Sequence, residues 1–140
     1  MLKSVLSVVV GVIAASIIIL AVELIGHSIY PPRAELDPTD PASIAMIPLS
    51  AQIAVVIAWF SGAFGGGIVA SRIANRWAPP AWVVAATILL LAGSTMLQIP
   101  HPAWMVIGAV AATGLGGWLS VKLTKAYYGR PYPFASKPGN

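Results

Sequence analysis

Glu23, His27 and His101 are the side chains of this 140-residue chain whose types and spacing could do chemistry. Glu23 and His27 are four residues apart, so a helix would place them on one face, one turn from each other. A carboxylate and two imidazoles suit Zn²⁺, Ni²⁺ or Cu²⁺, and neighbouring methionines would favour Cu(I). One hypothesis is therefore a metal site, with a divalent transition metal or copper as its cofactor.

Two other interpretations of the same residues stay open. Glu23 would exchange protons with His27, because an imidazole titrates near neutral pH. Alternatively, Glu23 hydrogen-bonds His27, or a partner on another helix, and so fixes one end of the protein. The structural hydrogen bond is the leading interpretation of the three. The chain carries no nucleophile elbow, Walker loop or dinucleotide fingerprint, and it has no cysteine. We therefore expect no catalytic residues and no enzyme activity.

The elements that would position these residues follow from the composition. Hydrophobic residues make up 58% of the chain and charged residues 9%, where a soluble domain has about 25% charged residues. Four apolar segments approach or exceed the length of about 20 residues that a membrane helix needs, at about 5–29, 51–70, 81–99 and 103–121. Four segments are too few for a closed barrel. The sequence predicts an all-α, integral membrane four-helix bundle with up-down-up-down topology, forming one domain over 1–127.

Local signals predict the ends of these helices. Proline turns separate the segments, at Tyr30-Pro31-Pro32, Pro79-Pro80 and Pro100-His101-Pro102, because proline cannot donate to the helix ladder. Asp40 followed by Pro41 predicts the start of a short surface helix that continues through Met46. Ser50 is expected to cap the second span.

The distribution of charge predicts the orientation. Seven of the eight basic residues share one side with both termini, namely Lys3, Arg72, Arg76, Lys122, Lys125, Arg130 and Lys137. The positive-inside rule makes that side cytoplasmic. The loop 31–50 is then external, and 128–140 is a short cytoplasmic tail. Because the basic residues flank the spans, they indicate the lipid bilayer as a partner and no nucleic acid.

Small residues recur at four-residue spacing on the second and fourth spans. They are Gly62, Gly66 and Ala70 on the second span and Gly108, Ala112 and Gly116 on the fourth. Such faces let membrane helices approach closely. They predict either packing inside one bundle or an interface with a second copy or a larger membrane complex.

One stretch carries a family resemblance. Glu23-Leu-Ile-Gly-His-Ser-Ile-Tyr-Pro-Pro, an acidic Asp-Pro loop, and the helix ending Gly62-Ala-Phe-Gly-Gly-Gly-Ile-Val-Ala-Ser-Arg resemble small uncharacterised bacterial four-helix membrane proteins. The resemblance implies a bacterial inner (plasma) membrane location and no particular activity.

Two functions are consistent with these patterns. The first is a non-enzymatic accessory or assembly component that packs through its glycine-rich faces. The alternative is a periplasm-facing membrane protein that binds metal, or handles metal or protons, through Glu23, His27 and His101.

Overall fold

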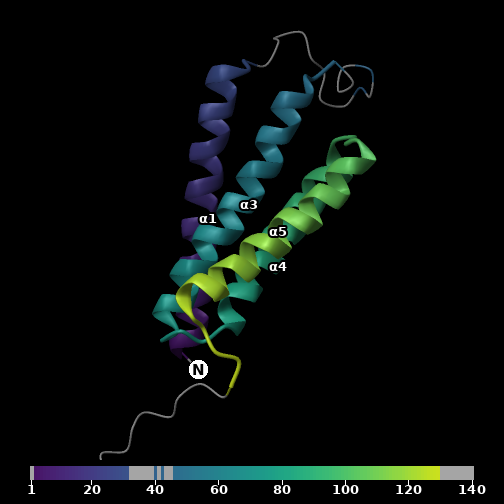
Figure 1. The fold of residues 1–140 in the computed structure, drawn as a ribbon. Coiled ribbons are helices and arrows are strands. Elements are labelled where there is room, and N and C mark those ends of the chain that lie inside the picture. Colours follow the sequence, from purple (N-terminus) through teal and green to yellow (C-terminus); the bar gives the residue numbers. More distant parts are fainter. Residues whose placement is uncertain (1, 32–39, 41, 43–45, 130–140) are drawn as a thin grey trace, which may run out of the picture.

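The computed structural model describes residues 2–31, 40, 42 and 46–129, and these residues form four helices. They are α1 (Leu2–Ile29), α3 (Leu49–Ile73), α4 (Pro79–Gln98) and α5 (Ala103–Thr124). Consecutive helices run in opposite directions (Figure 1), and all four are long and apolar enough to cross a membrane. The predicted all-α, multi-pass membrane fold is confirmed.

The proline turns end and begin the helices as predicted. Helix α1 ends at Ile29, just before Tyr30 and Pro31. Helix α4 starts at Pro79, with proline in its first turn, where the missing N–H would have no helical partner in any case. Pro102 is the residue preceding α5.

The start of α3 differs from the prediction. Ser50 does not cap the helix, because α3 already begins at Leu49 and Pro48 occupies the capping position. The Pro48 carbonyl accepts the first backbone hydrogen bond, from the Ala51 N–H at 3.0 Å. The carboxylate of Asp40 accepts a hydrogen bond from the Ala42 N–H at 3.1 Å, but most of the expected short helix lies outside the described residues.

The molecule has two unlike ends. We call the end with the last turn of α1, the first turn of α3 and the α4–α5 connection the histidine end. The opposite end, with the first turn of α1, the α3–α4 connection and the last turn of α5, is the terminal end. At the terminal end, the Ala78 N–H donates to the Tyr127 carbonyl, and the Tyr127 N–H donates to the Arg76 carbonyl, both at 2.9 Å. The segment after α5 is thereby joined to the α3–α4 connection.

Two tryptophans strengthen this junction at the terminal end. The Trp77 indole donates to the Gly129 carbonyl at 2.8 Å, and the Trp82 indole donates to the Tyr128 hydroxyl at 3.0 Å. Tyr128 and Gly129, at the start of the expected tail, are therefore held against the bundle.

Glycines let the helices approach closely in the terminal half. A Cβ atom placed on Gly66 would lie 2.5 Å from the Gly11 carbonyl oxygen, so the backbones of α1 and α3 nearly touch there. A Cβ on Gly116 would lie 2.8 Å from the Phe60 carbonyl oxygen, which marks a similar crossing of α5 over α3. Real Cβ atoms do not tolerate such distances, so these crossings require glycine.

The histidine half is packed more loosely. A Cβ on Gly26 would meet only Ala54, at 3.5 Å, and a Cβ on Gly108 would meet Val56 at the same distance. Helix α1 contacts α3 and α4 but not α5, and the α1–α3 and α4–α5 pairs separate toward the histidine end (Figure 1). The bundle is therefore open at that end.

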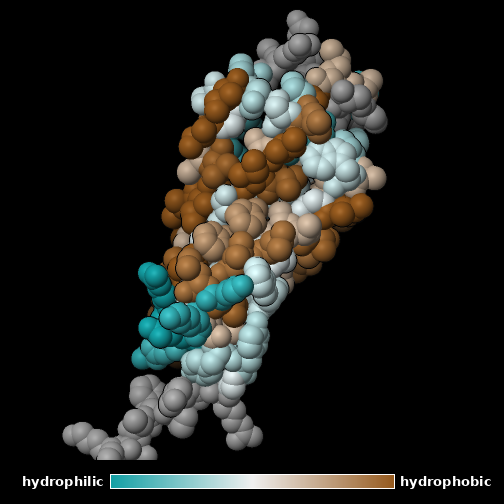
Figure 2. Space-filling model, in the orientation of Figure 1, coloured by the Kyte–Doolittle hydropathy of each residue, from teal (hydrophilic) through white to brown (hydrophobic). Residues whose placement is uncertain are grey.

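Apolar residues dominate the surface along the helices. Figure 2 shows them over the length of the bundle, with hydrophilic residues gathered at the terminal end. Ile13, Ile17 and Leu90 are among the large apolar side chains that stay exposed. This surface suits a lipid environment, in which apolar side chains need no cover.

Candidate functional site

A cavity of about 430 Å³ lies at the histidine end, between the last turns of α1, the first turns of α3 and the α4–α5 connection. We call it the histidine cavity. Most of its lining is apolar, and its polar side chains are Glu23, His27, Tyr30, Gln52 and His101. A volume of this size falls within the range of about 300–1,000 Å³ typical of small-ligand sites.

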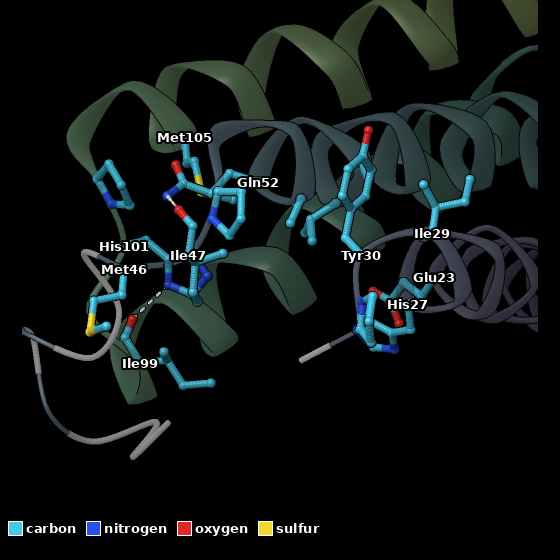
Figure 3. A pocket seen from close by; sticks show the side chains of 17 residues that line it. Glu23, His27, Ile29, Tyr30, Met46, Ile47, Gln52, Ile99, His101 and Met105 are labelled. Atoms are coloured by element: carbon cyan, nitrogen blue, oxygen red, sulfur yellow. Dashed lines mark hydrogen bonds between the residues drawn. The ribbon is translucent and has the colours of Figure 1, made fainter. Parts of the chain in front are cut away.

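The structure brings the three predicted site residues to this one cavity. Glu23 and His27 lie on α1 at one side, and His101 reaches the cavity from the α4–α5 connection at the other side (Figure 3). Glu23 and His101 are half-buried, whereas His27 is exposed. All three therefore lie at one end of the molecule, as the alternating directions of the four helices require.

One hydrogen bond determines the proton position on His101. Its Nδ1 lies 2.6 Å from the Ile99 carbonyl oxygen. A carbonyl oxygen can only accept, so Nδ1 carries the proton and donates. In the neutral ring, Nε2 is then the nitrogen with a lone pair, available to accept a hydrogen bond or to bind a metal.

The expected hydrogen bond between Glu23 and His27 is not present, so the leading interpretation of these residues is wrong. Neither side chain forms a hydrogen bond or ion pair with any residue that the structure describes. Spacing of four residues places two side chains on one face of a helix, but their rotamers remain free. Glu23 is therefore a half-buried carboxylate without a protein partner among the described residues.

The metal hypothesis has partial geometric support. The three residues line the histidine cavity together with Met46 and Met105. Across 2–31, 40, 42 and 46–129, however, no group of three or more histidine, aspartate or glutamate side chains lies close enough to hold a metal ion. As they stand, Glu23 and His27 face His101 across the cavity without converging on one point.

A second cavity of about 240 Å³ continues from Glu23 toward the middle of the bundle. We call it the Trp59 cavity, because Trp59 of α3 lines it between α1 and α4. Its lining is Ser16, Ile19, Leu20 and Glu23 from α1, Trp59 from α3, and Ile88, Leu91, Ala92 and Thr95 from α4. Glu23 is the residue that lines both cavities.

Most of the lining of the Trp59 cavity is apolar. Its two hydroxyl groups are occupied, because Ser16 donates to the Val12 carbonyl at 3.0 Å and Thr95 donates to the Ala92 carbonyl at 2.7 Å. Glu23 therefore lies where two mostly apolar cavities meet, and it is the carboxylate in the lining of both.

The predicted small-residue faces lie inside the bundle. Gly62, Gly66, Ala70, Ala112 and Gly116 are buried, and Gly108 is half-buried. Gly66 packs against Gly11 and Ala15 of α1, and Gly116 packs against α3. These positions serve internal helix packing in the described structure.

Sequence reasoning missed the contribution of Tyr30 and of the Trp59 cavity. Tyr30 is named only as part of a proline turn, and Trp59 and Ile88 lie within predicted spans to which no site is assigned. Hydropathy carries no signal for a cavity between helices, because a cavity depends on the angles at which the helices cross.

Comparisons of the chain with protein families, with curated proteins and with solved structures gave no match. The site is therefore interpreted from its own chemistry.

Proposed function

We propose that this chain is a small-ligand-binding protein of the bacterial inner membrane, with the histidine cavity facing the periplasm. The observation that carries the proposal is that Glu23, His27 and His101, which come from two separate segments, line one cavity of ligand size. A mostly apolar cavity with a few convergent polar groups is the usual form of a small-molecule site.

This proposal departs from the accessory role that the glycine faces suggested. Those faces are filled by the protein's own helices, so a partner could not use them without separating the bundle. The lipid-facing surfaces of α1 and α5 would remain for a partner, and nothing distinguishes them from surfaces that contact lipid. The cavity is a more specific feature, and it supports the ligand-binding proposal.

A blocked cavity gives the test of ligand binding. Ala51 lines the histidine cavity, and Ala51→Phe would fill part of it. Ala111 is exposed on α5, so Ala111→Phe is the matched control. In native mass spectrometry of protein purified from its own membrane, we expect a small-molecule adduct on the parent protein and on Ala111→Phe that Ala51→Phe lacks. The same adducts on all three proteins, or none on any, would contradict the proposal.

The orientation has its own test, which the absence of cysteine in this chain makes simple. Ser28→Cys places a thiol at the histidine end, and Gly129→Cys places one at the terminal end; both residues are exposed. We expect a membrane-impermeant maleimide to label Ser28→Cys from the periplasmic side and Gly129→Cys only after the membrane is opened. The reverse pattern would place the cavity in the cytoplasm.

A further inference from the structure

We propose that the ligand is an organic ammonium ion with an apolar chain, whose charged group binds at Glu23 and whose chain occupies the Trp59 cavity. This inference rests on the proposed function and adds the chemical class of the ligand. It starts from the position of Glu23, which is the residue shared by the histidine cavity and the Trp59 cavity.

The charge of the cavities favours a cation. Glu23 is half-buried and lacks a partner among the described residues, and an unpaired carboxylate near the apolar part of a membrane is costly. No lysine or arginine lines either cavity within the described residues.

The hydrogen-bond chemistry of Glu23 fits an ammonium group. The carboxylate of Glu23 accepts hydrogen bonds only. An ammonium group is made of donors, so it complements acceptors of this kind. A hydrogen bond in which both partners are charged is about twice as strong as a neutral one.

The shape of the Trp59 cavity favours an apolar chain. From Ser16 to Glu23 the cavity follows about two turns of α1, or about 10 Å. Its walls include Ile19 and Ile88, and its edges include Leu20 and Leu91, which are 57% and 51% exposed. Because its edges are exposed on lipid-facing helices, a chain can enter this cavity sideways from the bilayer.

The test uses the full-length protein in non-ionic detergent and three probes of equal chain length. Decylammonium carries the charge, decanol is uncharged, and decanoate is anionic. In native mass spectrometry titrations, we expect decylammonium to bind at one per protein and both other probes to bind at least about tenfold more weakly. Equal binding of decanol or decanoate would overturn the inference.

Matched variants locate the two parts of the ligand. Glu23→Gln should weaken decylammonium binding by about tenfold or more, whereas Glu23→Asp keeps the charge and should recover most of the affinity. Leu20→Trp should obstruct the Trp59 cavity and reduce binding. Leu24→Trp, one turn further along α1 at a side chain that lines neither cavity, should not. Unchanged binding in both Glu23→Gln and Leu20→Trp would refute the assignment.

The ammonium group could belong to a free alkylamine or to phosphatidylethanolamine, and a parallel titration with short-chain phosphatidylethanolamine distinguishes the two. Binding of either compound supports the inference if Glu23→Gln weakens that binding. If Ala51→Phe removes the native adduct while decylammonium binds no better than decanol, the ligand class is wrong and the proposed function stands. If Ala51→Phe has no effect on the native adduct, the proposed function itself fails.

Discussion

The terminal half and the histidine half of this bundle are built from the same four helices, yet they pack differently. In the terminal half, a Cβ atom on Gly11 would lie 2.8 Å from Ala70 and 2.9 Å from the Gly66 carbonyl oxygen. In the histidine half, a Cβ on Gly26 of the same helix would meet only Ala54, at an ordinary 3.5 Å. Close helix crossings at glycine hold the terminal half together. In the histidine half, the helices lie farther apart at Gly26, and the histidine cavity fits between them.

This difference indicates a division of roles along the membrane normal. Between helices in lipid, association depends on close van der Waals packing rather than on burial of apolar surface. The crossings at Gly66 and Gly116 therefore carry much of the tertiary stability. The histidine half depends less on packing, so polar groups such as Glu23 and His101 can line a space there.

The largest expected effect comes from comparing the two glycines of α1. Gly11→Ala should lower the free energy of unfolding by about 1–3 kcal/mol, because the new methyl group overlaps the α3 backbone. Gly26→Ala should leave it unchanged or raise it by up to about 1 kcal/mol, because alanine favours the helix and has space. Thermal unfolding in mild detergent measures both. Equal destabilisation by the two variants would contradict the comparison.

A second pair tests the same comparison on α5. Gly116→Ala should destabilise the protein, by about 1–2 kcal/mol, since its methyl group would approach the Phe60 carbonyl oxygen. Gly108→Ala meets Val56 at an ordinary contact distance and should be close to neutral. If Gly108→Ala were the more harmful of the two, the histidine half would have to be tighter than its geometry indicates.

The junction at the terminal end should give a smaller effect. Trp77→Phe removes the hydrogen bond to the Gly129 carbonyl and should cost about 0.5–1.5 kcal/mol. Amide hydrogen exchange at Tyr127 should become faster, because its N–H belongs to the same junction. Phe60→Leu, a change away from this junction, should leave that exchange rate unaltered. If the exchange rate at Tyr127 were unchanged in Trp77→Phe, the backbone hydrogen bonds of Tyr127 would be sufficient to hold the segment after α5 in place.

The smallest effect is expected at Ser71, inside the packed half. Its hydroxyl is buried and has no hydrogen-bond partner among the residues that the structure describes, so Ser71→Ala removes an unsatisfied polar group. We expect the free energy of unfolding to stay within about 0.5 kcal/mol of the original or to rise. Ser120→Ala is the matched control, because the buried Ser120 hydroxyl donates to the Gly117 carbonyl at 2.7 Å. A larger loss in Ser71→Ala than in Ser120→Ala would reveal a partner for Ser71.

Sequence reasoning predicted the helices well and the site only in part. Proline turns and long apolar segments indicated where α1, α4 and α5 begin or end, because both signals act locally on the backbone. The spacing of Glu23 and His27 predicted their common face but also a hydrogen bond that is not formed. His101 could be assigned to the same end of the molecule from topology alone, whereas its tautomer required the observed contact with Ile99.

The sequence by itself determined that this chain forms four apolar helices, and that Glu23, His27 and His101 lie at one end. Those properties follow from the cost of exposing backbone groups to lipid and from the order of residues along each helix. Tertiary structure alone decided that Gly66 and Gly116 face neighbouring helices and that Glu23 connects two cavities. Such features depend on the crossing angles of helices far apart in the chain, and local residue patterns leave those angles open.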